Sequence, residues 1–100
     1  MTDYTGKKVL IRADRAGVFF GTLADHDKAN GVVELHKCRR IWYWSGAASL
    51  SQMANDGVKN PSGCKFTQVV ESMQIAGVIE VLPCTQEAAK CIKEVPVWQR

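Results

Sequence analysis

The pair Asn30-Gly31 constrains the fold of this chain most, because it lies between two segments in which apolar and polar residues alternate. Asn-Gly is strongly preferred in the short loops of β-hairpins, where the backbone needs positive φ angles. The segment that follows, Val32–His36, places Val33 and Leu35 on one face of an extended strand. We therefore expect two antiparallel strands that are joined here by a tight turn.

Other segments continue this pattern of short strands. Asp14–Gly17 is rich in turn-forming residues and separates two segments of strand-like composition. Gly77 interrupts a long apolar stretch, which should therefore form one final strand or two. The segments that we expect to form strands are Lys8–Arg12, Val18–Leu23, Val32–His36, Arg40–Trp44, Phe66–Val70 and Met73–Leu82.

Capping residues predict two short helices. Ser49 and Gln52 have the spacing of a capping box, and Gly57 is a natural stop. Thr85 can cap a second helix, and Pro96 must end it. The expected helices lie near Ser49–Asp56 and Thr85–Glu94.

These elements predict a mainly β (α+β) fold, with a small antiparallel sheet or barrel and two short helices. The length of 100 residues allows one domain, residues 1–100, with a single modest core. The formal charge of +3 is mild. Strong non-specific nucleic-acid binders usually carry a denser basic stripe, so this charge suits a small anionic ligand at least as well as a polymer.

The cysteines indicate the compartment rather than a metal site. No CxxC pair and no zinc-ligand spacing occurs among Cys38, Cys64, Cys84 and Cys91. The sequence shows no signal peptide and no apolar run long enough to span a bilayer. We expect free thiols, no metal, no membrane partner and a cytoplasmic location in the cell that makes the protein.

Motifs of catalysis are absent from the sequence. It has no Gly-rich phosphate loop, no nucleophile elbow and no HExxH. His26 is flanked by acids, but it belongs to an expected solvated turn. Cys38 lies two residues from His36, and no third group that would orient a catalytic pair is visible. We therefore expect a binding protein with no catalytic residues and no cofactor, rather than an enzyme.

The run Arg39–Ala47 carries the candidate binding residues. Strand alternation puts Arg40, Trp42 and Trp44 on one face. Guanidinium groups bind phosphates and indoles stack on bases, so this face fits a nucleotide, although it also fits a protein partner. The alternative is structural: the tryptophans lie buried under the first helix, and the arginines are solvated beside acidic neighbours.

Phe19 and Phe20 raise the question of assembly. Neighbouring strand residues point to opposite faces, so only one of these rings can enter a single-sided core. The other should face solvent, a ligand or a second subunit, which predicts a homo-oligomer. Arg12 shares a face with Leu10 and places a cation beside apolar surface.

Four segments of the chain form a recognisable pattern: Ala16–Leu23, Arg39–Ala47, Leu50–Ala54 and Ile79–Thr85. Together they resemble a family of small phage-encoded proteins, the family that contains the first type of Thoeris anti-defence protein. The similarity covers most of the chain, and Arg-Arg-Ile-Trp-Tyr-Trp is its most specific part.

This resemblance implies a function. Proteins of that family are sponges: they bind the cyclic ADP-ribose signal that a TIR enzyme makes from NAD during Thoeris defence, and they hold it intact so that the effector stays inactive. Some members form hexamers and hold cyclic trinucleotides of CBASS defence at a separate site. By resemblance, this chain would act in the cytoplasm of an infected bacterium.

Residue chemistry within the matching segments gives the candidate ligand contacts. Aromatic rings can stack the adenine, and arginines can bind the pyrophosphate. The expected ligand-binding residues are Arg12, Phe19, Phe20, Arg39, Arg40, Trp42 and Trp44. The alternative function is a small nucleic-acid-binding or protein-interaction β-domain, which would use the same residues.

Overall fold

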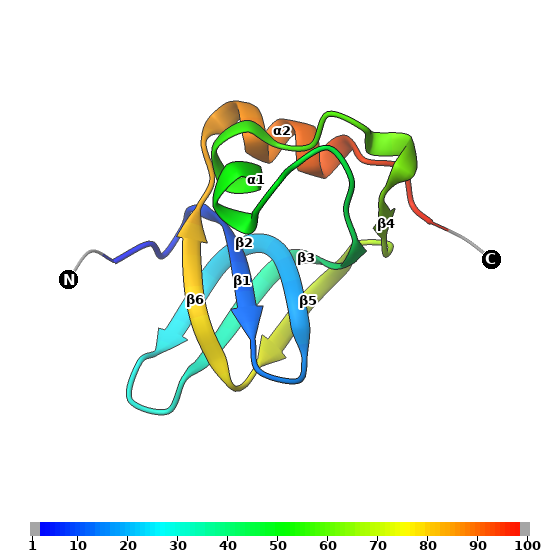
Figure 1. Ribbon diagram of the computed structural model, residues 1–100. Helices are drawn as coiled ribbons and strands as arrows, with labels where there is room; N and C mark the ends of the chain where they lie inside the picture. Colours follow the sequence, from blue (N-terminus) through cyan, green and yellow to red (C-terminus); the bar gives the residue numbers. More distant parts are fainter. Residues whose placement is uncertain (1–2, 99–100) are drawn as a thin grey trace.

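The computed structural model describes residues 3–98 and has the expected class, a mainly antiparallel β-sheet with two helices (Figure 1). A 3₁₀ turn, Pro61–Gly63, lies between α1 and β4. The elements are β1 (Lys8–Ala13), β2 (Gly17–Asp27), β3 (Val32–Tyr43), α1 (Leu50–Asp56), β4 (Lys65–Phe66), β5 (Val70–Ile75), β6 (Val78–Pro83) and α2 (Gln86–Glu94).

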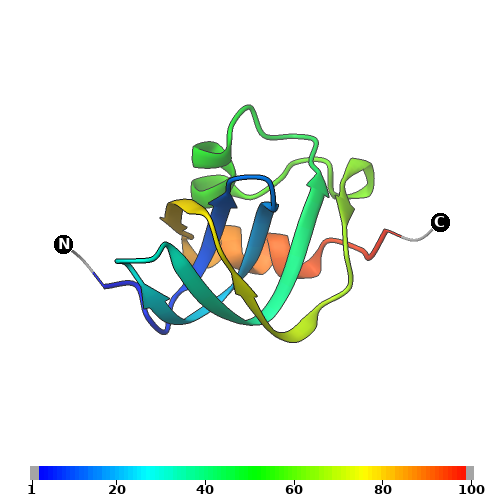
Figure 2. The same ribbon diagram turned by 90° about the horizontal axis from the view of Figure 1, so that it is seen from below.

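The strands form one six-stranded sheet in the order β4-β3-β2-β1-β6, and β5 pairs with β3 beside β4. Every pairing between these strands is antiparallel. The sheet curves strongly, and α2 lies across its strands (Figure 2). This curvature gives the sheet a concave side, filled by side chains of the strands, and a side that both helices cover.

The hairpin predicted around Asn30-Gly31 is confirmed, with a wider turn than expected. Asp27 and Val32 close the hairpin, and residues 28–31 form the turn. Gly31 has a φ of 65°, whereas the Asp27 carboxylate accepts hydrogen bonds from the backbone and side-chain nitrogens of Asn30 at 3.3 and 2.8 Å. The side chain of Asn30 therefore stabilises the turn without a positive φ of its own.

The strands predicted at Val32–His36 and Arg40–Trp44 are one continuous strand, so the prediction of a break between them is wrong. Lys37 has a φ of 52° and forms a bulge at the expected break. The neighbouring strand β2 faces this bulge with Gly21, where an added Cβ would lie 3.1 Å from the carbonyl oxygen of His36. A glycine on β2 thus lets the ladder pass the bulge without ending.

Both helices begin and end where their caps predict. The Ser49 side chain accepts a hydrogen bond from the Gln52 backbone at 3.1 Å, and Gly57 ends α1. The Thr85 hydroxyl accepts one from the Ala88 backbone at 3.1 Å and also donates to the Asn55 carbonyl at 2.7 Å. Thr85 thereby fixes α2 against the end of α1.

The strand predicted at Phe66–Val70 is divided. β4 ends at Phe66 and β5 begins at Val70. The two strands are separate because β4 pairs with the C-terminal end of β3, whereas β5 pairs with the part of β3 that precedes it. The expected break at Gly77 is confirmed, since Gly77 has a φ of 73° and separates β5 from β6.

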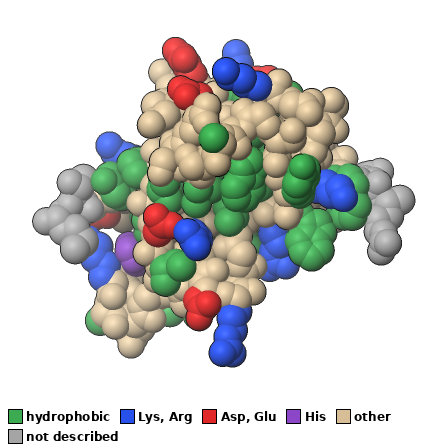
Figure 3. Space-filling view, in the orientation of Figure 1, with side chains coloured by type: hydrophobic (Ala, Val, Ile, Leu, Met, Phe, Trp, Pro, Cys, Tyr) green, Lys and Arg blue, Asp and Glu red, His purple; other side chains and the backbone are tan. Residues whose placement is uncertain are grey.

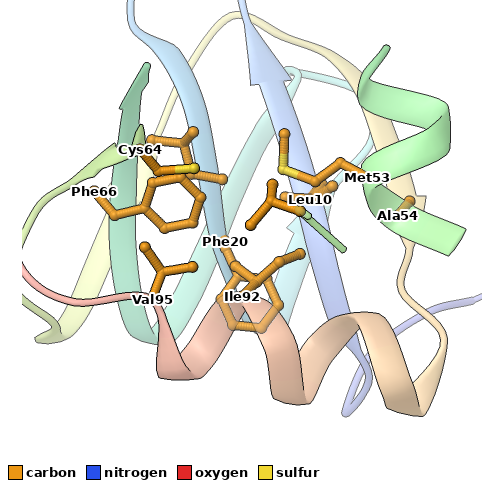
Figure 4. Close-up of a cluster of buried hydrophobic side chains, with 10 residues drawn as sticks. Leu10, Phe20, Met53, Ala54, Cys64, Phe66, Ile92 and Val95 are labelled. Carbon is orange, nitrogen blue, oxygen red and sulfur yellow. The ribbon is translucent and has the colours of Figure 1, made fainter. Parts of the chain in front are cut away.

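Phe19 and Phe20 are both buried, at 1% and 4% exposure, in two different cores of the same chain. Phe20 packs on the helix-covered side with Met53, Phe66 and Ile92 (Figure 4). Phe19 packs on the concave side among residues of β1, β2, β3 and β5. The expectation that one of these rings faces solvent, a ligand or a second subunit is therefore wrong, because the curved sheet buries both of its faces within one chain.

Candidate functional site: a cationic cavity at Arg39

Arg39 is the one charged residue buried among those that the structure describes, with 2% of its surface exposed. Its Nε donates to the Thr67 carbonyl at 3.0 Å. Its Nη1 donates to three carbonyls at the end of α2, those of Ile92, Lys93 and Val95, at 3.2, 3.3 and 2.8 Å. Arg39 therefore satisfies backbone carbonyls at the negative end of the helix dipole.

The bulge at Lys37 is what places Arg39 on the helix-covered side. Val33 and Leu35 point into the concave core, and strict alternation would send Arg39 to that same side. The extra residue at the bulge reverses the alternation, so that Cys38 enters the concave core instead. The guanidinium also lies over the Phe66 ring, 5.1 Å from its centroid.

The second terminal nitrogen of Arg39, Nη2, is buried and has no hydrogen-bond partner within residues 3–98. A buried guanidinium donor without an acceptor is unfavourable, because its interaction with water has been lost and not replaced. Burial also lowers the pKa of the Arg39 side chain. A bound anion would supply the acceptor that Nη2 lacks and would favour the charged form of the guanidinium.

Arg39 lines a cavity of about 310 Å³ whose remaining walls are cationic or apolar. The lysine side chains come from β1, from the bulge of β3 and from α2, and their aliphatic parts join residues of β2 and of the lead into β5 in a mostly apolar wall. The lining residues are Lys8, Phe20, Lys37, Arg39, Val69 and Lys93. Four positive charges around one cavity provide a strong attraction for a multiply charged anion.

A second, more open hollow of about 430 Å³ adjoins this cavity and shares Lys8 and Lys93 with it. Two further lysines, Lys7 and Lys90, lie along it. Cys84 contributes a thiol to its lining, and burial raises the pKa of this thiol to about 12. The thiol is therefore neutral at physiological pH, and the charge of the second hollow comes from its lysines.

Two lysines of the cavity already have polar partners, which do not themselves line it. The Lys37 ammonium donates to a Glu71 carboxylate oxygen at 2.6 Å, and both side chains are exposed. The Lys8 ammonium donates to the Thr22 hydroxyl. Glu71 is the only acidic side chain, within the described part of the chain, that forms an ion pair with a lysine of this cavity.

The structure brings together two of the seven expected ligand-binding residues, Arg39 and Phe20. Sequence reasoning missed the three lysines and Val69. The signal for Lys37 was its closeness to Arg39 in the sequence, whereas Lys8 and Lys93 lie far away along the chain and carried no local signal.

The other expected residues lie elsewhere. Phe19 is buried in the concave core, and the Arg40 guanidinium covers its ring at 5.0 Å from the centroid. Arg12 forms an exposed ion pair with Glu80 at 3.2 Å. These three predicted contacts are thus outside the cavity, because each side chain points to a different part of the sheet surface or core.

The two tryptophans of the aromatic run do not act as a pair. Trp42 is 65% exposed, whereas Trp44 is half-buried and packs against the helix-side core. The prediction that they share one face with Arg40 is wrong for Trp44, because β3 ends at Tyr43 and the chain turns there.

A separate aromatic and cationic surface surrounds the end of β3. The Lys65 ammonium lies 6.0 Å from the Tyr43 ring centroid and 5.2 Å from that of Trp98. Tyr43 is exposed here, whereas Trp42 precedes it in β3, and successive strand residues point to opposite faces. Hydrophobic and basic side chains gather on the side of the molecule where β4 and the C-terminal segment lie (Figure 3). We refer to Tyr43, Lys65 and Trp98 as the aromatic surface.

Neither a metal cluster nor a membrane-spanning helix occurs in the described part of the chain. Within residues 3–98, His, Cys, Asp and Glu form no group of three or more that could hold a metal ion. No helix in this range is long and apolar enough to cross a membrane. The four cysteines are free thiols.

Comparison with known proteins gives one match. A family model described as a domain of unknown function, DUF6948, matches residues 6–92. The chain belongs to this family. The matched range includes all the strands that the structure describes. Of the residues that line the cavity, it includes all but Lys93. No curated protein and no solved structure matches the chain.

Proposed function

We propose that this protein is an anti-defence sponge that binds a cyclic ADP-ribose-type signal and holds it without altering it. The signal would be the product of a Thoeris TIR enzyme in the cytoplasm of an infected bacterium. The resemblance of the sequence supplies the identity of the ligand. The single observation that carries anion binding is Arg39, whose Nη2 is buried without a partner and whose side chain lines a cavity together with three lysines.

The chemistry of the cavity suits such a ligand. The pyrophosphate of a cyclic ADP-ribose can accept from Arg39 Nη2 and from the lysine ammonium groups. Phe20 and Val69 offer apolar surface to the uncharged part of the ligand. The volume of about 310 Å³ is at the lower end for small-molecule sites, so we place the rest of the ligand toward the adjoining hollow.

The functional test uses the product of an activated TIR enzyme and an effector that consumes NAD. The protein should silence the effector, and heating the mixture should restore activity by releasing intact ligand. A cleaved product detected by mass spectrometry would show that the protein is an enzyme and would contradict the proposal. An effector that is never silenced would favour the alternative function.

A charge-matched pair of double variants tests the location of the site. Lys8→Gln with Lys93→Gln removes two cavity charges, whereas Lys28→Gln with Lys59→Gln removes two charges from exposed lysines outside it. Charge-assisted hydrogen bonds are strong, so we expect the cavity variant to weaken binding about tenfold to a hundredfold. Equal affinities of the two variants in calorimetry would place the ligand elsewhere.

The aromatic surface supports the alternative function and the prediction of assembly. Tyr43 is 54% exposed beside the Lys65 ammonium, and Trp42, the preceding residue of β3, is 65% exposed. Exposed aromatic residues of this kind are typical of macromolecular interfaces. We propose that a second copy of the chain packs here, so that the protein forms a homo-oligomer. Some members of the resembled family form hexamers. The resemblance also implies a separate site for cyclic trinucleotides.

Light scattering and salt dependence separate these possibilities. A mass of 11.1 kDa at all concentrations would contradict the homo-oligomer. If the protein instead binds single-stranded nucleic acid through the aromatic surface, its affinity should fall steeply as salt increases, and Tyr43→Ser should abolish binding.

A further inference from the structure

One lysine of the cationic cavity is already paired with a carboxylate from outside the cavity. Lys37 lines the cavity, and its ammonium lies 2.6 Å from a carboxylate oxygen of Glu71. A ligand anion that reaches Lys37 must therefore replace this carboxylate or share the lysine with it.

The sheet fixes this arrangement. On β3 and β5, His36 pairs with Ser72 and Cys38 pairs with Val70, so that Lys37 and Glu71 face each other between these two pairs. The bulge that directs Arg39 toward α2 also places Lys37 at the cavity. One local irregularity of β3 therefore positions both the buried cation and the cation that Glu71 occupies.

The ion pair is easily broken. The side chains of Lys37 and Glu71 are 65% and 80% exposed, and exposed pairs of this kind contribute little to stability. The hydrogen bond from Lys37, followed by its charge, lowers the pKa of Glu71, so the carboxylate is ionised at neutral pH. A phosphate or pyrophosphate group that also contacts Arg39 carries more charge than one carboxylate and can displace it.

We infer that Glu71 is a specificity-determining residue of the cavity, which occupies Lys37 in the free protein and gives it up when a phosphate-bearing ligand binds. This inference rests on the proposed anion binding at Arg39. Glu71 acts through Lys37 and not through the ligand itself. Because an anion must first displace Glu71 from Lys37, only anions that bind strongly occupy the cavity. Weakly bound, singly charged metabolites are therefore disfavoured.

The test measures binding of inorganic pyrophosphate by calorimetry at low ionic strength. Glu71→Gln should tighten binding about threefold to tenfold, because Lys37 is then free to bind the anion. Glu80→Gln is the matched control, since Glu80 also forms an exposed ion pair, but its partner Arg12 does not line the cavity. The control should change the affinity less than twofold.

A double-mutant cycle shows whether Glu71 acts through Lys37. In a Lys37→Gln background, Glu71→Gln should leave the affinity within twofold. An equal gain with and without Lys37 would overturn the inference in favour of a long-range charge effect.

The outcomes separate this inference from the proposed function. If the wild type binds pyrophosphate and the TIR product but Glu71→Gln does not tighten binding, the role of Glu71 is wrong and the proposed function stands. If the wild type binds neither, both fall together.

Discussion

Arg39 is buried, and the structure allows the cost of replacing it to be estimated. Its guanidinium donates hydrogen bonds to Thr67 and to three carbonyls at the end of α2. Three of these four bonds share Nη1, so we count about two full charge-assisted bonds, each worth roughly 1.5–3 kcal/mol. Loss of the desolvated cation offsets part of this sum.

We therefore expect Arg39→Met to lower the free energy of unfolding by about 3–5 kcal/mol, a large part of the stability of a small domain. Arg40→Met is the neighbouring control. Its side chain is exposed over the Phe19 ring, 5.0 Å from the centroid, so its loss should cost about 1 kcal/mol or less.

Urea denaturation of the three proteins, followed by circular dichroism, measures both differences. Hydrogen exchange should also show faster opening at the end of α2 in the Arg39 variant, since the carbonyls there lose their donor. If Arg39→Met does not fold, Arg39→Lys and Arg40→Lys replace the pair, because one ammonium cannot reach both Thr67 and the end of α2. Equal stability of the two variants in either pair would refute the structural role of Arg39.

Three further predictions concern other parts of the fold. Gly46→Ala should cost more than about 2 kcal/mol in urea denaturation, because Gly46 has a φ of 88° and a Cβ would lie 2.5 Å from the Asn60 backbone nitrogen. Thr85→Ala removes a helix cap and a hydrogen bond to Asn55, which should cost about 1–2 kcal/mol of unfolding free energy. The melting temperature should therefore fall by several degrees, and an unchanged melting temperature would contradict this role. Burial raises the pKa of the Cys38 thiol from 9.0 to about 11. The unfolded chain therefore loses this proton first, and stability should fall as the pH rises from 9 toward 11, by about 2 kcal/mol more in the wild type than in Cys38→Ala; parallel pH profiles would argue against a buried neutral thiol.

The sequence determined the local elements, because each of them depends on residues close together in the chain. Ser49 and Thr85 cap the helices that they were expected to cap, and Gly77 breaks the last apolar stretch. The hairpin near Asn30-Gly31 follows from turn preferences and the apolar pattern on either side. These features together gave the mainly β class with two short helices.

Only the tertiary structure decided which face each side chain occupies. One extra residue at Lys37 joins two expected strands and moves Arg39 to the helix side, because a change of one residue reverses every later position in a strand. Curvature of the sheet buries both Phe19 and Phe20, which strand alternation alone could not foresee.

The cavity is also a product of the tertiary fold. Lys8 and Lys93 lie at opposite ends of the chain, and they meet because β1 lies beside β2 in the sheet and α2 packs across the strands. No spacing in the sequence encodes such a meeting, since it depends on strand order and on the position of a helix. The sequence therefore determined which charges the chain carries, and the packing of sheet and helix determined that four of them line one cavity.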